Sequence, residues 1–338
     1  MSGLNIALVC GPMLQQKLFT PKTIDGLREL GTLITNPKDT LTAEELVALA
    51  HDADVILTSW GAPVFTPEVL DQLPRLKYVA HAAGSIKSFA TDELFDRGVR
   101  VTSSATVLSK GVSETALGLT IACLKNFFNV SRDIAAGGWT GETPLKSYDD
   151  IRELVEVKIG CVGAGIAGSH YLKLLGMFNV ELLVYDPFVS ADVLREKYNA
   201  RKVSLEELLA ESDVVSIHAP SIPETYHMFN ADTLKLMKKD ASLINTARGS
   251  LVDETALYEH MKAGNLKYAC LDVFDPEPPK ADNPLRTLPN VIMTPHLAGQ
   301  THNGLLRIGS HCLEEIKRFI TGEKLTTEIL KEQLATMA

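Results

Sequence analysis

Short apolar runs alternate with stretches of helical spacing along most of the chain. In the first hundred residues the apolar runs predict strands at residues 5–9, 54–58, 76–80 and 99–103. The stretches of helical spacing predict helices at residues 23–30, 42–50, 66–73 and 88–96. Because alternating strands and helices favour parallel pairing, this part of the chain predicts a parallel sheet with helices on both faces.

The pattern changes at Ser113, from which helical apolar spacing continues to about Ala136. We expect one long helix here, ended by the glycine-rich loop at residues 137–141. A second alternating series predicts six strands, at residues 157–162, 181–185, 213–217, 241–245, 268–272 and 291–293. Six parallel strands with intervening helices are typical of a doubly wound nucleotide-binding domain. A last helix is expected from Gly304 to Ile320, followed by a polar tail.

The first turn of the second series has a glycine pattern, Gly163-Ala164-Gly165-Ile166-Ala167-Gly168. An apolar strand leads into it, and a helical stretch is predicted from Ser169 to Phe178. In such a turn Gly163 permits the tight bend, Gly165 lets the backbone approach a pyrophosphate, and Gly168 lets helix and strand pack closely. The helix N-terminus would then offer free N–H groups and a partial positive charge to the phosphates.

The next strand ends at Asp186, where a carboxylate can accept a hydrogen bond from the ribose 2′-OH of an adenosine. A carboxylate would repel a 2′-phosphate, and Pro187 and Phe188 supply no arginine to bind one. The pattern therefore favours a dinucleotide site for NAD rather than NADP. The alternative is a glycine-rich turn that binds nothing. The strand, the helix and the acid all lie at their expected positions around the turn, which argues against this alternative.

Length and composition set the broad class of the protein. A chain of 338 residues is long enough for about two domains, and 45% hydrophobic and 22% charged residues are ordinary for a globular protein. The net charge of −9 argues against nonspecific nucleic-acid binding, because polyanions would be repelled. Five scattered cysteines have no metal-ligand spacing, so we expect buried free thiols, a reducing compartment and no metal site: Cys10, Cys123, Cys161, Cys270 and Cys312.

The sequence predicts no targeting or membrane segment. No basic region followed by an apolar run begins the chain. The longest apolar stretches, such as residues 116–124, are about half of the ~20 residues that a membrane span needs. We therefore expect a cytoplasmic protein.

Four further segments follow in order along the second half of the chain. They are Ser216-Ile-His-Ala-Pro220 with Pro223-Glu224-Thr225, Leu243-Ile-Asn-Thr-Ala-Arg248-Gly249 with Val252-Asp253-Glu254, Cys270-Leu-Asp272-Val-Phe274-Asp-Pro-Glu277-Pro278, and Thr294-Pro295-His296-Leu-Ala-Gly299. With the glycine turn, they make the chain similar to the D-isomer-specific 2-hydroxyacid dehydrogenase family from about Asp54 to Thr301. Five ordered signatures argue against chance resemblance.

The resemblance implies an α/β architecture with two doubly wound parallel-sheet domains. A Rossmann NAD domain, residues 111–302, would be inserted into a flavodoxin-like substrate domain formed by residues 1–110 and 303–338. The resemblance also implies a homodimer joined through the nucleotide domains, with the helix near Ser113 and its tryptophan loop as the expected interface.

Three side chains are expected to perform the chemistry. His296 follows a predicted strand, and an imidazole can accept a hydroxyl proton from an alcohol, or return it to a ketone, near neutral pH. Glu277, similar to the family's acid, would orient the ring and favour the imidazolium. Arg248 can bind a substrate carboxylate and carbonyl through its planar fork of N–H groups. The alternatives are a structural histidine, a structural ion pair for Arg248, and Asp275 as the acid partner.

Other site residues follow from the resemblance alone. Those expected to bind the cofactor are Gly163, Gly165, Ile166, Ala167, Gly168, Asp186, Ala219, Pro220, Thr246, Ala247, Asp272 and Gly299, with Asp272 on the nicotinamide carboxamide. Ala83 and Gly84 would bind the substrate carboxylate through backbone N–H groups, beside Arg248 and His296. The family's turn at residues 81–87 usually has an acid that is missing here, and Lys87 either pairs with a second anionic group of the substrate or lies solvated.

The function that the resemblance implies is hydride transfer between NAD(H) and a small D-2-hydroxy acid or 2-keto acid. Trp139 would close an active site or lie in an interface or core. A different class of protein, an NAD(H)-sensing corepressor-like binding protein of the same fold, is the alternative. Glu277 argues against the family's formate dehydrogenases, in which a glutamine replaces it.

Overall fold

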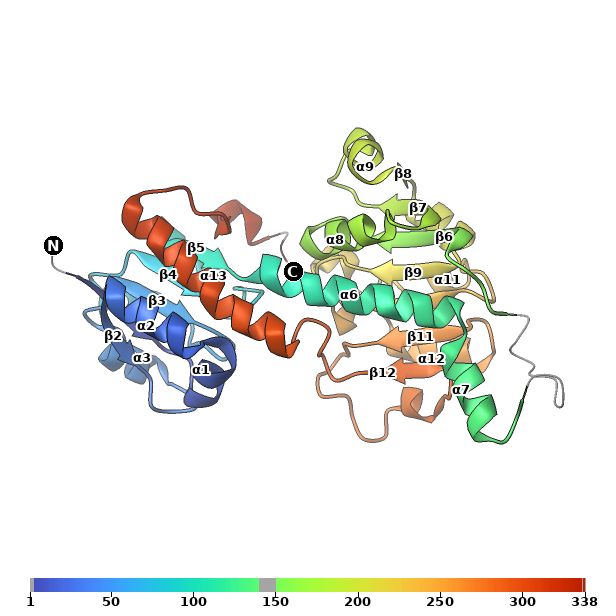
Figure 1. The fold of residues 1–338 in the computed structure, drawn as a ribbon, viewed down its shortest axis with the longest axis horizontal. Helices are drawn as coiled ribbons and strands as arrows, with labels where there is room; N and C mark the ends of the chain where they lie inside the picture. The colour runs from blue at the N-terminus through green and yellow to red at the C-terminus, as the bar shows by residue number, and fades with distance from the viewer. Residues whose placement is uncertain (1–2, 140–149, 336, 338) are drawn as a thin grey trace. The chain divides into compact units, whose positions relative to one another are not determined.

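A computed structural model describes residues 3–139, 150–335 and 337. The chain divides into two compact units, Met1–Leu108 with Gln300–Met337, and Ser109–Gly299. The predicted domain boundaries lie within three residues of these divisions. Each unit contains its own largely parallel sheet (Figure 1).

The first unit has a six-stranded sheet in the order β13-β5-β4-β3-β1-β2. Its strands are β1 (Leu4–Leu8), β2 (Gly31–Thr35), β3 (Val55–Thr58), β4 (Tyr78–His81), β5 (Arg100–Ser103) and β13 (Glu328–Ile329). Its helices are α1 (Pro12–Leu18), α2 (Pro21–Leu30), α3 (Ala43–Ala50), α4 (Pro67–Asp71), α5 (Asp92–Asp96) and α13 (His302–Thr321). The parallel strands have the flavodoxin-like order 2-1-3-4-5, and β13 adds antiparallel to β5.

Side-chain alternation along the strands divides the core of this unit into two layers. Ile6 and Leu8 of β1 pack with Leu27 of α2 on one face of the sheet. Ala7, between them, packs with Leu46 of α3 on the opposite face. Both faces are therefore covered, which explains why the strands read as continuous apolar runs.

The second unit has a seven-stranded parallel sheet in the order β12-β11-β10-β9-β6-β7-β8. Its strands are β6 (Val155–Val162), β7 (Asn179–Tyr185), β8 (Ala200–Lys202), β9 (Val214–Ile217), β10 (Ser242–Asn245), β11 (Tyr268–Leu271) and β12 (Val291–Met293). Its helices include α8 (Ile166–Leu175), α9 (Ala191–Tyr198), α10 (Leu205–Glu211), α11 (Ala231–Leu234) and α12 (Glu254–Lys262). The strand order reverses between β6 and β9, and doubly wound sheets bind ligands beside this point.

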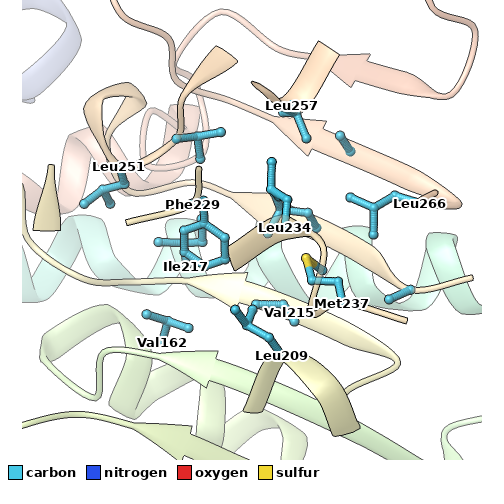
Figure 2. Packing of buried hydrophobic residues seen from close by; sticks show 14 of the residues in the cluster. Val162, Leu209, Val215, Ile217, Phe229, Leu234, Met237, Leu251, Leu257 and Leu266 are labelled. Carbon is cyan, nitrogen blue, oxygen red and sulfur yellow. The ribbon is translucent and has the colours of Figure 1, made fainter. Parts of the chain in front are cut away.

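Buried apolar side chains cover both faces of the second sheet as well. Figure 2 shows one layer, in which Val162 and Val215 of the sheet pack near Leu209 and Phe229. On the other face Cys161 packs in a separate cluster. The tight packing of both layers fixes the carboxyl ends of the strands, where the predicted site residues lie.

The predicted long helix is wrong in both its start and its continuity. The structure has α6 (Ala105–Leu124) and α7 (Phe127–Ala135) instead. Between them buried Asn126 has φ +54°, a left-handed conformation that ends a helix. Its Oδ1 accepts a hydrogen bond of 2.6 Å from the hydroxyl of Tyr268. A tertiary contact thus stabilises a break that apolar spacing does not reveal.

Three short strands were also missed by the sequence pattern. β2 follows α2 directly, β8 has three residues, and β13 lies in the predicted polar tail. All three are edge strands, so none has the apolar run of a buried central strand. The helix predicted from Ser169 to Phe178 instead runs from Ile166 to Leu175.

The apolar helix α6 is long enough to cross a membrane by length and composition. Its Ala116, Cys123 and Leu124 are buried in the core of the second unit, and 39% of its apolar window is buried. All five cysteines are free and buried, which confirms the expectation of buried free thiols.

Candidate active site

The glycine turn joins β6 to α8 with the backbone geometry that its sequence requires. Gly163 has φ +93°, and a Cβ there would lie 2.8 Å from the backbone of His218 and Ala219. A Cβ on Gly168 would lie 2.0 Å from the carbonyl oxygen of Gly163, so helix and turn can pack only without one. A Cβ on Gly165 would have open space, with no described atom within 4 Å. The turn is thus closed on its inner side and open toward a ligand.

Asp186 fastens the glycine turn to the end of β7. Its Oδ2 accepts a hydrogen bond of 2.7 Å from the Ala164 N–H. Its Oδ1 accepts from the N–H groups of Phe188 and Val189 at 2.8 and 2.9 Å. Asp186 is 6% exposed. Asp186 therefore holds the turn in place, a role that the sequence did not indicate, in addition to the predicted ribose contact.

Further predicted cofactor residues follow the neighbouring parallel strands. Ala219 and Pro220 lie after β9, Thr246 and Ala247 after β10, Asp272 after β11, and Gly299 after β12. Within the described part of the chain, two buried polar atoms here lack hydrogen-bond partners, Nδ1 of His218 and Oγ1 of Thr246. Burial lowers the pKa of His218 to about 4, so its imidazole is neutral at pH 7. Unsatisfied buried polar atoms at this edge are what a polar ligand would pair with.

Arg248 lies directly before the short helix η2 (Gly249–Leu251). Its Nη1 donates a hydrogen bond of 2.7 Å to the carbonyl oxygen of Ala247. Burial lowers the pKa of the guanidinium, and the charge of Glu277 partly offsets this effect. A half-buried guanidinium near one carboxylate is well suited to bind a second anion, since a partly desolvated charge is costly to leave unpaired.

His296 and Glu277 form a direct pair. Nδ1 of His296 lies 2.7 Å from Oε2 of Glu277, and Oε1 of Glu277 accepts from the Phe274 N–H at 3.0 Å. An ionised carboxylate only accepts hydrogen bonds, so with Glu277 ionised Nδ1 donates in this pair and Nε2 is the ring nitrogen that faces a substrate's proton in the proposed chemistry. Asp275, the alternative acid in the same loop, is as exposed as Glu277, so the contact with the ring and not burial distinguishes the two acids. The structure thus brings Glu277 to the imidazole.

Asp272 holds the loop that carries His296. Its Oδ1 accepts hydrogen bonds from the Thr294 hydroxyl at 2.5 Å and the Leu297 N–H at 2.9 Å, and its Oδ2 accepts from the Ala298 N–H at 2.8 Å. Its backbone carbonyl oxygen accepts from the His296 N–H at 2.7 Å. The sequence assigned this carboxylate to the cofactor and did not indicate its role in the loop.

The arginine and the acid lie on segments that touch through their backbones. A Cβ on Gly249 would lie 1.9 Å from the carbonyl carbon of Phe274. Glycine is therefore required for this approach of the two segments. Gly249 was recognised as part of a motif, but only the fold shows which segment lies opposite.

Other predicted residues lie on other segments of the chain. Ala83 and Gly84 follow β4 in the first unit, where Ala83 is buried. Trp139 is 61% exposed, and most of the loop beyond it, from residue 140, lies outside the described residues.

Comparison with known families decides what this chain is. The family model described as D-isomer specific 2-hydroxyacid dehydrogenase, NAD binding domain, matches residues 117–298, more than half of the chain. The chain belongs to the D-isomer-specific 2-hydroxyacid dehydrogenase family. The predicted family and fold class are thereby confirmed.

Two curated relatives and one solved structure place the chain within this family. A glyoxylate reductase from Thermofilum pendens is 35% identical over 292 residues, covering 86% of this chain and 85% of the relative. A D-3-phosphoglycerate dehydrogenase from Methanocaldococcus jannaschii is 34% identical over 84% of this chain, which spans 53% of that relative's length. The structure of a D-lactate dehydrogenase from Aquifex aeolicus, complexed with NAD and lactic acid, has a TM-score of 0.73 and 28% identity, covering 94% and 96% of the two chains.

The residues of this 2-hydroxyacid dehydrogenase domain fit a dinucleotide. The turn is open over Gly165, and α8 begins at once with Ile166. Nδ1 of His218 and Oγ1 of Thr246, which have no hydrogen-bond partner among the described residues, follow β9 and β10 at the same edge of the sheet. NAD is therefore the cofactor that matches both the family and the site.

Proposed function

We propose that this protein is an NAD-dependent dehydrogenase that interconverts a small D-2-hydroxy acid and its 2-keto acid. The observation that carries the proposal is the 2.7 Å contact between His296 and Glu277, with the half-buried Arg248 close enough for the charge of Glu277 to act on its guanidinium. The pair can move a proton, and the guanidinium can bind an acid.

Each residue has a separate task in this proposal. Bound NAD would supply the hydride acceptor. Arg248 would bind the substrate carboxylate and polarise the carbonyl, while Nε2 of His296 would take the hydroxyl proton during oxidation or return it during reduction. Glu277 would hold the imidazole and stabilise the imidazolium. Ala83 and Gly84, as the resemblance implies, would donate backbone N–H groups to the carboxylate.

Small keto acids are the first substrates to test. Relatives named glyoxylate reductase, hydroxypyruvate reductase and D-3-phosphoglycerate dehydrogenase favour short, polar acids. NADH oxidation is measured with glyoxylate, hydroxypyruvate, pyruvate and bulkier 2-keto acids, and we expect turnover with at least one of the short acids. Tight NADH binding without turnover of any of them would favour the corepressor-like alternative, which the names of the relatives do not favour.

His296→Ala tests the proton transfer. We expect kcat to fall about 10²- to 10⁴-fold, because general acid–base catalysis contributes this much. NADH affinity, measured by fluorescence, should persist. His51→Ala is the matched control, since His51 is exposed on the first unit. A variant at position 296 that retains full turnover would contradict the proposal.

The remaining expectations concern assembly and location. We propose a homodimer, and the exposed apolar side chains of α7, Phe127 and Ile134, are available to a second copy of the chain. None of the described residues of α7 is buried within its own chain. Cytoplasmic location, and the absence of membrane and nucleic-acid partners, stay predictions.

A further inference from the structure

The loop that carries Glu277, residues 275–283, lies largely on the surface. We call it the acid loop. Asp275, Pro276, Glu277 and Pro278 are all exposed. An exposed loop tends to be mobile, yet the proposed chemistry needs the carboxylate of Glu277 at a fixed distance from His296. The loop therefore requires an anchor.

Glu254 accepts hydrogen bonds from both ends of the acid loop. Its Oε1 accepts from the Asp275 N–H at 2.9 Å, and its Oε2 accepts from Nδ2 of Asn283 at 2.6 Å. The same Asn283 side chain caps the helix η3 (Pro284–Thr287) through its Oδ1, which accepts from the Leu285 N–H at 3.0 Å. One carboxylate thus holds the first and the last residue of the loop.

Glu254 itself lies on a rigid support. It is the first residue of α12, and the side chain of Asp253 caps that helix by accepting from two backbone N–H groups. Leu251 and Leu257, on either side, are fully buried in the core cluster of Figure 2. Arg248 precedes the same segment, separated from it by η2. The anchor of the acid loop is therefore continuous with the segment that carries the arginine.

We propose that Glu254 is a positioning residue for the proposed reaction: it fixes the acid loop, and hence the Glu277 carboxylate, relative to Arg248. The inference rests on the proposed function. Glu254 acts through Glu277 and is not itself placed to touch the reacting atoms. If the anchor is lost, the loop moves, and the ring of His296 loses a defined partner. Misplacement of about 1 Å in such a site can lower the rate up to about 100-fold.

Three single variants test this role. Glu254→Ala removes both hydrogen bonds. Asn283→Asp keeps an Oδ1 that can cap η3, but it replaces the donor by a charge that repels Glu254. Glu259→Ala is the matched control, because it removes an exposed carboxylate from the same helix. We expect kcat to fall about 10- to 100-fold in the first two variants, with NADH affinity unchanged, and no change in the control.

A double-mutant cycle with Glu277→Ala distinguishes positioning from general stabilisation. If Glu254 acts through Glu277, Glu254→Ala costs little further activity once Glu277 is absent. A full multiplicative loss in the double variant, or wild-type kcat in both Glu254→Ala and Asn283→Asp, would overturn the inference. Should Glu254→Ala fail to fold, Asn283→Asp carries the test.

Hydrogen exchange of the acid loop separates this inference from the proposed function. Wild-type turnover of a keto acid tests the function, whereas exchange at residues 275–283 tests the anchor without any substrate. We expect faster exchange in Glu254→Ala and Asn283→Asp than in Glu259→Ala. Unchanged exchange in both variants overturns the role of Glu254 even if the wild type is active.

Discussion

His296 is held in a backbone conformation that few residues other than glycine adopt. Its φ is +54°, in the left-handed region, which costs an L-residue about 1–2 kcal/mol. Asp272 offsets that cost with three side-chain hydrogen bonds and one backbone bond around the same loop. Strain of this kind persists where the surroundings over-determine it, as at an active site. In this conformation the ring lies against Glu277.

Arg248→Lys tests the planar fork of the guanidinium. We expect kcat/KM for the keto acid to fall about 100-fold or more, because an ammonium cannot bind a carboxylate and a carbonyl in the same bidentate geometry. NADH affinity should be preserved. Arg195→Lys, at an exposed helical ion pair, is the control. Equal kcat/KM in wild type and Arg248→Lys would contradict bidentate binding of the substrate by Arg248.

His81 predicts a pH dependence of stability in the first unit. Burial lowers its pKa to about 3 from an ordinary 6.5, and its Nδ1 lies 2.9 Å from the Thr58 hydroxyl. Between pH 6.5 and 3 the unfolded chain therefore binds a proton that the folded chain does not. Stability should fall as the pH falls through this window, by at most about 1.4 kcal/mol per pH unit. Urea unfolding of wild type, His81→Asn and the exposed-site control His51→Asn measures it.

In that experiment the sign of the difference is decisive. His81→Asn removes the titrating group, so its free energy of unfolding should depend less on pH below 6.5 than that of wild type. Equal slopes in the two proteins would show that His81 does not titrate as its burial requires.

The packing of two loops places the arginine near the acid. The arginine segment and the segment after β11 approach so closely that Gly249 has no room for a methyl group against Phe274. A glycine in this position reflects contact with a distant segment rather than a turn, since its φ is not positive.

Gly249→Ala should therefore damage both stability and catalysis. The new Cβ meets backbone atoms, which cannot rotate away, so we expect a loss of about 3 kcal/mol of unfolding free energy and at least about a tenfold lower kcat. Gly118→Ala in α6 is the control, because no described atom lies within 4 Å of its Cβ position. Thermal unfolding and steady-state kinetics measure both effects. Wild-type behaviour of Gly249→Ala would refute the close approach.

The two units have the same α/β construction but different strand orders. The first has the flavodoxin-like order and the second the doubly wound order with a reversal between β6 and β9. Alternation of strands and helices predicted both sheets, and the motifs predicted that the second binds the dinucleotide. The edge strands β2, β8 and β13 were missed, because an edge strand needs no continuous apolar run.

The proposed homodimer can be tested on the whole protein. We expect light scattering to give about twice the 36.8 kDa mass of one chain. Phe127→Glu, on the exposed face of α7, should shift the mass toward one chain, because burying a charge at an interface is costly. Met13→Glu, equally exposed on the first unit, should not. A monomeric wild-type protein would contradict the proposed homodimer.

Local chemistry together with the family resemblance was enough to propose the candidate groups. The glycine turn, Arg248 and His296 were proposed because backbone approach, bidentate binding and proton transfer each favour one residue type. The acid partner of the histidine was open between Asp275 and Glu277, and only the fold pairs one of them with the ring.

Contacts between distant segments decided the rest. Four hydrogen-bonded contacts join residues far apart in the chain. They involve Asn126 at the helix break, Asp186 at the glycine turn, Asp272 at the loop of His296, and Glu254 at the acid loop. Such contacts leave no periodic signal, because a carboxylate that binds backbone N–H groups reads in sequence like any other acid. Periodicity reports which face of an element is buried, whereas the partners on that face are set by how the elements pack.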